Sequence, residues 1–296
     1  MMVYHTQVGA KSPEIERVGK MALIAMKELL LEAAANKYAV GGFEFWSLDS
    51  VRAIIEAAEE FEKCVILQAG PYEIEYMGLK NVERAVKYMA EQSSVKIALH
   101  LDHSTDTKWV KYAIDNGFTS VMIDASALSF EENIELTQET VALASPYGVT
   151  VEAELGRVPG EEGDIMLNES EAYQTNVDEA VVFVKQTGID CLAVAVGTAH
   201  GVYRSLPKIN LTRIGELCTA LDVPLVLHGG SGIPDDTVIK AIKAGISKIN
   251  VCTEFMDAFG KSYNSGYKPS VRGLFEPGYL AGKEVIKEKI KLFSGM

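Results

Sequence analysis

The sequence predicts an α/β fold, a single (β/α)8 TIM barrel, because eight short apolar segments alternate with amphipathic ones. The apolar segments are rich in Val, Ile and Leu and are almost unbroken by polar residues, which is typical of parallel strands buried on both faces. The expected strands span residues 38–45, 65–69, 96–101, 120–124, 150–155, 191–196, 224–227 and 248–251.

The segments between these strands have apolar residues at helical spacing, and several end at a glycine, such as Gly117, Gly188 and Gly245. The expected helices include residues 51–61, 82–90, 109–116, 131–144, 178–186 and 237–244. A doubly wound open sheet is the alternative arrangement of such units. It is less favoured because no G-x-G-x-x-G motif stands at a first strand–helix turn.

The N-terminal region begins with a polar stretch, residues 1–18, which we expect to form an arm before the barrel domain of residues 19–296. The apolar run at residues 21–35 is interrupted by Lys27, Glu28 and Glu32. These charges predict an amphipathic helix that plugs the bottom of the barrel, rather than a signal peptide or a membrane span.

The overall charge limits the partners of the protein. A formal net charge of −13 disfavours nucleic acid and anionic membranes, so any phosphate site must be local and built from backbone N–H groups, helix N-termini or a bound cation. The four cysteines form no C-x-x-C pair, which is typical of a reducing compartment. The sequence therefore predicts a cytoplasmic protein that binds a small molecule.

Three of the five histidines, His103, His200 and His228, stand just after the third, sixth and seventh expected strands. A barrel brings such strand exits together on one face. Three imidazoles that leave a fourth position open are typical of a catalytic zinc site, although each histidine alone could instead cap a loop. His5 falls in the arm and has no expected role, and His100 is expected to support the site structurally.

Carboxylates and glycine-rich turns occupy the remaining strand ends. Asp102 adjoins His103, Asp124 ends the fourth strand, and Glu154 lies in the fifth. The loop that follows contains Glu162 and is either a mobile active-site loop or a solvated acidic loop. The turns at residues 229–232 and 250–253 follow the seventh and eighth strands, where barrels commonly bind phosphate.

Six sequence blocks, in this order, resemble the class II fructose-bisphosphate and tagatose-bisphosphate aldolases over nearly the whole chain from about Met21. The blocks are ALHLDHSTD (98–106), FTSVMIDAS (118–126), VTVEAELGRVPGEEGD (149–164), IDCLAVAVGTAHGVY (189–203), VPLVLHGGSGIP (223–234) and KINVCTE (248–254). The tract AVGTAHG and the PKI at residues 207–209 are most similar to the tagatose-type branch.

This resemblance implies reversible aldol cleavage of a ketose 1-phosphate or ketose 1,6-bisphosphate to dihydroxyacetone phosphate and an aldehyde. It implies Zn²⁺ on the three histidines, Asp102 as the group that handles the C4 hydroxyl proton, and Glu162 as the group that exchanges a proton on dihydroxyacetone phosphate. Asp124 and Glu154 match residues that hold a second or displaced metal ion. The expected phosphate and enediolate contacts are Gly201, Gly229, Gly230, Ser231, Asn250, Val251, Cys252 and Thr253. A monovalent cation, K⁺ or Na⁺, could assist them, and a homodimer or homotetramer is expected.

The chain departs from this family mainly on the side that holds the aldehyde. Glu44 replaces a family asparagine, Gly70 replaces a family serine, and the segment beginning at Glu276 lacks the arginine of the family D/E-P-R motif. Trp46 lies on the same side. Cys252 also departs, since Asp, Asn or Ala is usual there, but it falls on the dihydroxyacetone phosphate side.

Gain of a carboxylate and loss of a guanidinium should disfavour a distal phosphate, unless Arg272 replaces the lost arginine. Two other functions stay open. One is a zinc hydrolase on the same barrel, against which the phosphate-type turns argue. The other is a non-catalytic sugar-phosphate binding protein, against which the complete set of Asp102, the histidines and Glu162 argues.

Overall fold

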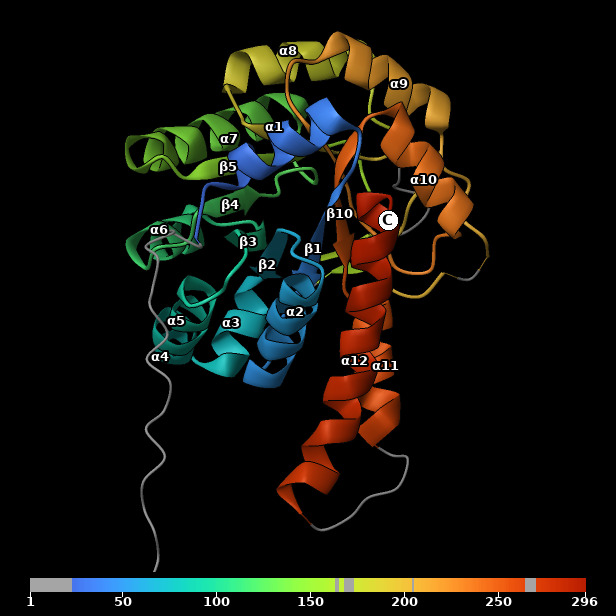
Figure 1. Ribbon diagram of the computed structural model, residues 1–296. Helices are drawn as coiled ribbons and strands as arrows, with labels where there is room; N and C mark the ends of the chain where they lie inside the picture. Colours follow the sequence, from blue (N-terminus) through green and yellow to red (C-terminus); the bar gives the residue numbers. More distant parts are fainter. Residues whose placement is uncertain (1–22, 163–164, 168–172, 204, 264–269) are drawn as a thin grey trace, which may run out of the picture.

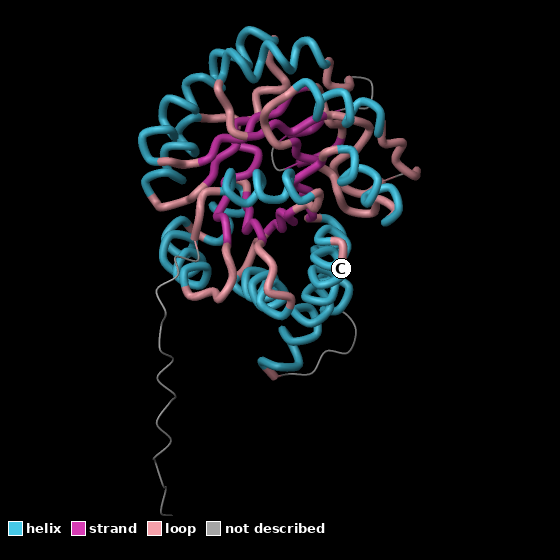
Figure 2. The backbone as a smooth tube through the Cα atoms, turned by 45° about the horizontal axis from the view of Figure 1, so that its top comes forward, coloured by secondary structure: helices cyan, strands magenta, loops and turns pink. Residues whose placement is uncertain are grey.

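A computed structural model describes residues 23–162, 165–167, 173–203, 205–263 and 270–296 (Figure 1). Eight parallel strands close into a barrel in the order β1-β10-β9-β8-β5-β4-β3-β2, so the predicted barrel is confirmed and the open sheet is excluded. The strands are β1 (Val40–Glu44), β2 (Val65–Ala69), β3 (Ile97–Ser104), β4 (Ser120–Ile123), β5 (Thr150–Leu155), β8 (Cys191–Val194), β9 (Leu225–Leu227) and β10 (Ile246–Val251). Figure 2 shows them as an inner ring with the helices outside.

Helices cover the outside of this ring, except α1, which closes its N-terminal end. They are α1 (Met26–Asn36), α2 (Leu48–Glu60), α3 (Pro71–Met77), α4 (Leu79–Asn81), α5 (Lys87–Glu91), α6 (Thr107–Asp115), α7 (Phe130–Ala144), α8 (Val177–Thr187), α9 (Leu211–Ala220), α10 (Asp235–Ala244), α11 (Thr253–Tyr263) and α12 (Val271–Ser294). In Figure 1, α11 and α12 lie side by side and extend past the barrel. No described helix combines the length and apolarity needed to cross a membrane.

The expected helix at residues 82–90 is found, and it is part of a longer helical connection. The connection after β2 is already helical from Pro71, and a π-helical segment (Val82–Val86) precedes α5. Gly78, with a φ of 87°, separates α3 from α4 because this left-handed conformation cannot continue a helix. The other five expected helices are found within a few residues of their predicted ends.

The expected plug at the bottom of the barrel is confirmed as α1. Its buried residues Met26, Leu29 and Leu30 form one apolar cluster with inward-facing strand residues, including Val40 and Ile66. This cluster fills the N-terminal end of the barrel, so the polar residues of the strands can concentrate at the opposite end. Residues 1–18, the expected arm, lie outside the described residues.

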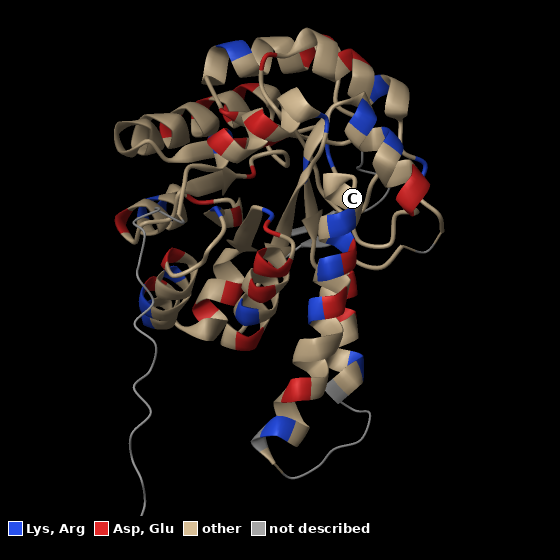
Figure 3. Cartoon of the chain, viewed as in Figure 1, with Lys and Arg blue, Asp and Glu red and all other residues tan. Residues whose placement is uncertain are grey.

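One further element follows β5. Strands β6 (Gly160–Glu162) and β7 (Ile165–Leu167) pair antiparallel as a short two-stranded sheet within the loop that the sequence had marked as mobile or solvated. Figure 3 shows acidic and basic residues interleaved on the outer helices, and over the whole sequence 41 acidic residues outnumber 28 basic ones.

Candidate active site

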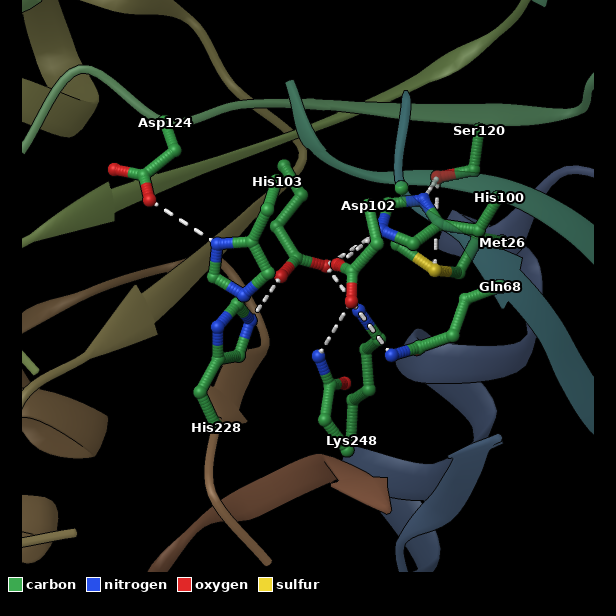
Figure 4. Close-up of polar contacts among 12 residues, drawn as sticks. Met26, Gln68, His100, Asp102, His103, Ser120, Asp124, His228 and Lys248 are labelled. Carbon is green, nitrogen blue, oxygen red and sulfur yellow. Dashed lines mark hydrogen bonds and ion pairs between the residues drawn. The ribbon is translucent and has the colours of Figure 1, made fainter. Parts of the chain in front are cut away.

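Three histidines from separate strand exits meet at the C-terminal end of the barrel. His103 comes from β3, His200 from the loop after β8, and His228 from the end of β9. One ring nitrogen of each lies within 4.8 Å of the others, and the ring centroids are 4.6 to 5.8 Å apart. The structure therefore brings together the imidazoles that the sequence had singled out, as Figure 4 shows for His103 and His228.

A local irregularity in β3 lets two consecutive residues face this site. Side chains alternate along a strand, so Asp102 and His103 would ordinarily point to opposite faces. The pairing of β3 with β4 shifts register between Leu101 and Ser104, and His103 has a φ of 41°. A non-glycine residue in this left-handed region is strained, and a bulge of this kind redirects side chains next to active sites.

Two carboxylates orient the imidazoles. His103 Nδ1 lies 3.1 Å from Asp124 Oδ2, and His228 Nε2 lies 2.8 Å from Glu152 Oε1. These contacts engage one nitrogen of each ring, in the way that carboxylates hold metal-binding histidines elsewhere. Burial lowers the pKa of both His200 and His228, which favours the neutral imidazole that a metal requires.

Glu154 stands beside the same cluster. Its Oε2 atom is 3.4 Å from His228 Nδ1, and it groups with His103 and Asp124 as a second possible metal-binding set. Burial raises the pKa of Glu154 well above its usual value, and the negative charge of Asp124 adds to this effect. Neutral imidazoles surrounded by buried carboxylates fit a divalent cation, which would offset this concentration of negative charge.

A fully buried lysine supports the site from inside the barrel, and the sequence analysis missed it. Lys248 Nζ lies 2.7 Å from Glu152 Oε2. Burial alone would raise the pKa of Glu152, but the charge of Lys248 and the hydrogen bond with His228 lower it to about 2. A lysine within an otherwise apolar strand was the available signal. His100 shares this interior layer, 3.6 Å from Glu152, as its expected structural role requires.

Two amides fix Asp102, which is also buried. Gln68 Nε2 donates to Asp102 Oδ2 at 2.6 Å, and Asn250 Nδ2 donates to the same oxygen at 3.2 Å. Burial opposes ionisation, but the electrostatic influence of the neighbouring His103 and the charge of Lys248 hold the pKa of Asp102 well below its usual value. Asp102 is therefore a carboxylate of defined orientation beside the histidines, and Gln68 is a second residue that the sequence analysis missed.

One pocket gathers most of the predicted ligand contacts. Its lining consists of Gln68, His103, His200, Gly201, Gly229, Ser231, Asn250, Cys252 and Thr253. Gly229 has a φ of 67°, and a Cβ there would lie 2.3 Å from the backbone oxygen of Ala199. No other residue fits this turn without a shift of the backbone. The side chain of Val251 packs in the hydrophobic core, so the contact expected of this residue would come from its backbone.

The start of α11 closes one side of this pocket. Cys252 and Thr253 line the pocket, and the backbone N–H of Glu254 donates to Ser231 Oγ at 3.3 Å. Unpaired N–H groups at a helix N-terminus attract anions. The hydroxyl of Tyr203, which sequence reasoning did not find, accepts from the N–H of Ala199 and donates to the backbone oxygen of Gly229. It thereby joins the loops after β8 and β9.

The residues expected on the aldehyde side lie at the exits of β1 and β2. Glu44 is buried, and its Oε1 atom accepts a hydrogen bond from the N–H of Gly70 at 3.0 Å. The Trp46 ring packs against Phe255 and Phe259 of α11, with centroids 4.7 and 5.6 Å apart. Trp46 therefore joins the exit of β1 to α11.

The structure describes the side chain of Arg272 but not that of Glu162. Glu162 belongs to β6, but its side chain lies outside the described residues. Arg272 has an exposed side chain at the start of α12, where Nε lies 3.6 Å from Glu276 of the same helix. Its pairing there gives no support to the idea that it replaces the lost arginine.

Comparisons with known proteins agree with this geometry. A family model described as fructose-bisphosphate aldolase class-II matches residues 24–295. A fructose-bisphosphate aldolase from Geobacillus stearothermophilus is 43% identical over 281 residues, and a sulfofructosephosphate aldolase from Alkalicoccus urumqiensis is 39% identical over 282 residues; each alignment covers 92% of this chain and 97% of the relative. The crystal structure of the YdjI aldolase from Escherichia coli K12 has a TM-score of 0.84 and 36% identity, covering 92% of this chain and 97% of that one.

Proposed function

Because this chain belongs to the class II fructose-bisphosphate aldolase family and is therefore a carbon–carbon lyase, we propose that it carries out a zinc-dependent, reversible cleavage of a ketose 1-phosphate to dihydroxyacetone phosphate and an aldehyde. The observation that carries this proposal is the meeting of three imidazoles beside the buried carboxylate Asp102. The sequence had predicted this arrangement, and the contacts of each side chain support it.

His103, His200 and His228 would hold the zinc ion, and Asp124 and Glu154 could receive a second or displaced ion. When bound, zinc supplies a Lewis acid that stabilises the negative charge left on substrate oxygens when the carbon–carbon bond breaks. The protein contributes the orientation of the rings, through Asp124 on one side and Glu152 on the other.

Asp102 is the proposed base for the C4 hydroxyl proton. A base must be ionised and correctly aimed before substrate binds, and the hydrogen bonds from Gln68 and Asn250 aim it. Its neighbour His103 places it beside the metal position. Glu162, on the β6–β7 hairpin, is the proposed group for proton exchange on dihydroxyacetone phosphate.

The phosphate of dihydroxyacetone phosphate would bind between the turn at residues 229–231 and the start of α11. Gly201, Ser231 and Thr253 line this part of the pocket, and the backbone N–H groups there need no positive side chain to attract an anion. A monovalent cation, K⁺ or Na⁺, would help to neutralise the phosphate in a protein whose net charge is −13.

The aldehyde side is altered. The buried carboxylate of Glu44 replaces the family asparagine, and the exposed side chain of Arg272 lies near Glu276 of its own helix. We therefore propose that the natural aldehyde carries no distal phosphate. A fructose-bisphosphate aldolase and a sulfofructosephosphate aldolase resemble this chain to a similar degree, so relatedness alone does not select the aldehyde.

A condensation assay tests the proposed function. Dihydroxyacetone phosphate is offered with neutral and phosphorylated aldehydes, and its disappearance is measured before chelation, after chelation and after zinc is restored. We expect consumption that chelator abolishes and zinc restores. If the zinc-loaded protein leaves dihydroxyacetone phosphate untouched with every aldehyde, the proposed function is wrong.

A further inference from the structure

His100 of β3 is a fully buried histidine that lies between two carboxylates. Its Nε2 atom is 3.4 Å from Asp102 Oδ1 and 3.6 Å from Glu152 Oε2. Asp102 is the proposed base, and Glu152 orients the ring of His228 through a contact of 2.8 Å. A single ring nitrogen of His100 therefore faces both the group that handles the proton and a group that supports the metal position.

The other ring nitrogen of His100 contacts Ser120 of β4. His100 Nδ1 is 2.8 Å from Ser120 Oγ, and the same oxygen is 3.6 Å from the Sδ atom of Met26 in α1 (Figure 4). A hydroxyl has one hydrogen, so Ser120 can donate to only one of these two atoms. A thioether sulfur is a weak acceptor, and the ring nitrogen is also much closer, so donation to His100 Nδ1 is favoured.

These neighbours determine which nitrogen of His100 carries the hydrogen. Burial lowers the pKa of His100 and the charge of Lys248 lowers it further, against the opposing influence of Asp102 and Glu152, so the ring is neutral and has one N–H group. A hydrogen on Nδ1 would leave the lone pair of Nε2 facing two carboxylates, which repel it. A hydrogen on Nε2 faces the same carboxylates as a donor, while Nδ1 accepts from Ser120.

Asp102 depends on this N–H group more than Glu152 does. Asp102 Oδ2 accepts two hydrogen bonds from side-chain amides, but Oδ1 has no aligned hydrogen bond among the described residues, and His100 Nε2 is the donor beside it. Glu152 Oε2 already has Lys248 Nζ at 2.7 Å. A buried carboxylate oxygen without a donor is costly, so loss of the His100 N–H group should affect the position of Asp102 first.

We propose that His100 is a positioning residue for the proposed base: Ser120 fixes the ring in its Nε2–H form, and this N–H group holds the carboxylate of Asp102 in place. Through Glu152, the same group gives weaker support to the ring of His228. Because it concerns the orientation of the proposed base, this role rests on the proposed aldolase function. A histidine that only filled space would need neither an N–H group at Nε2 nor a particular tautomer.

Two amide substitutions test this role. Counted in bonds from the backbone, the amide nitrogen of glutamine stands at the position of His100 Nε2, and that of asparagine stands at the position of Nδ1. His100→Gln can therefore still donate to Asp102, whereas His100→Asn can donate only toward Ser120. In condensation of dihydroxyacetone phosphate with glyceraldehyde by the zinc-loaded protein, we expect kcat to fall about 10- to 100-fold in His100→Asn and much less in His100→Gln. KM for dihydroxyacetone phosphate should change little, because His100 does not line the pocket.

Two further variants separate positioning from general loss of packing. Both amide variants replace a buried ring by a smaller side chain and should lose stability, so a difference in kcat between them does not come from stability alone. Ser120→Ala removes the hydroxyl that fixes the tautomer, and kcat should fall by less than in His100→Asn. Met26→Leu removes the competing sulfur at similar volume and should leave kcat unchanged. Bound zinc per chain is measured on each preparation.

The tautomer of His100 can also be observed without turnover. Nitrogen-15 chemical shifts distinguish a ring nitrogen that carries a hydrogen from one that does not, and the signals of His100 are those that disappear in His100→Gln. We expect a protonated Nε2 and a bare Nδ1 in the native protein. A protonated Nδ1 with a bare Nε2 would overturn the proposed role, whatever the rates of the variants.

The possible outcomes separate the role of His100 from the function on which it rests. If His100→Asn and His100→Gln condense the substrates equally fast, or if His100→Asn is the faster, the proposed role is overturned and the aldolase function stands. If the native zinc-loaded protein consumes no dihydroxyacetone phosphate with any aldehyde, the proposed function is wrong. The role of His100 in holding a base then falls with it.

Discussion

The two sides of the pocket are built in contrasting ways. The exits of β8, β9 and β10 provide imidazoles, glycine turns and the N-terminus of α11, which suit a metal ion and a phosphate. The exits of β1 and β2 provide the amide of Gln68, which lines the pocket, and the buried carboxylate of Glu44 behind it. Asp102 lies between them and receives hydrogen bonds from Gln68 of one side and Asn250 of the other.

This contrast indicates how one barrel can retain its reaction while its substrate specificity changes. The metal and phosphate side depends on backbone turns and cross-barrel contacts, in which one change disturbs several partners. The aldehyde side depends on side chains of separate loops, so Glu44 and Gly70 can differ from the family pattern without altering the histidines.

The largest effect is expected from a substitution in the proposed metal site. His200→Ala should remove one of three ligands and lower kcat/KM by about 10³-fold or more, because the Lewis acid is lost with the ion. The measurements are turnover and bound zinc per chain. Lys108→Gln, at a side chain that is 90% exposed, is the control and should change neither. Full activity in a zinc-free His200→Ala protein would contradict the proposed mechanism.

The second-largest effect is expected from a substitution that removes the proposed base and keeps the three metal ligands. Asp102→Asn keeps the shape of the side chain but removes the base, so kcat should fall on the order of 10²- to 10³-fold while zinc content stays unchanged. Rate and bound metal are measured on the same preparation. Loss of zinc in this variant would show that Asp102 supports the metal site and would leave its role in the proton step unsupported.

Sequence reasoning found the groups whose position follows from the barrel itself. Strand exits of a closed parallel barrel must meet, so His103, His200 and His228 could be grouped without coordinates. The bulge that turns His103 inward could not be foreseen, because it depends on a register shift between β3 and β4 and on a positive φ. Neither the register shift nor the positive φ can be read from the amino-acid sequence.

The residues that contact these groups could not be identified from the sequence either. Lys248 and Glu152 are 96 positions apart, and their pairing depends on strand order and on which residues share an interior layer. The hydrogen bond from the Gly70 N–H to Glu44 joins residues 26 positions apart, and it too depends on the pairing of β1 with β2. The sequence could therefore predict which residue types gather at the barrel mouth, while the identity of their supporting contacts required the three-dimensional arrangement.

A smaller effect tests how the interior layer supports the metal side. Lys248→Met should leave the carboxylate of Glu152 buried without its cation, so the ring of His228 is no longer held firmly. We expect zinc affinity to fall about 10- to 100-fold by chelator competition. The unfolding free energy of the metal-free protein should fall by about 3–5 kcal/mol.

The control for this variant is Lys283→Met, which removes a lysine–glutamate pair on the outside of the barrel. It should lower stability slightly and leave zinc affinity unchanged. Zinc affinity that is equally insensitive to Lys248→Met would mean that Glu152 orients His228 without help from Lys248.

The smallest expected effect concerns the frame of the aldehyde side, where α12 packs on α2, the helix that follows β1. Glu56 of α2 accepts hydrogen bonds from Arg52, Tyr279 and Lys283. Burial alone would raise the pKa of Glu56, but these partners lower it from 4.5 to about 2.

The folded protein therefore binds the Glu56 proton more weakly than the unfolded chain does. The resulting stabilisation is complete above pH 4.5 and is lost as the pH falls toward 2. Because this carboxylate is about a third exposed, solvent screening should limit its contribution to about 1 kcal/mol. The unfolding free energies of the native protein and Glu56→Gln, measured by urea titration from pH 6 to pH 3, should converge as the pH falls. A constant difference between the two curves would show that packing of α12 on α2 does not depend on this charge.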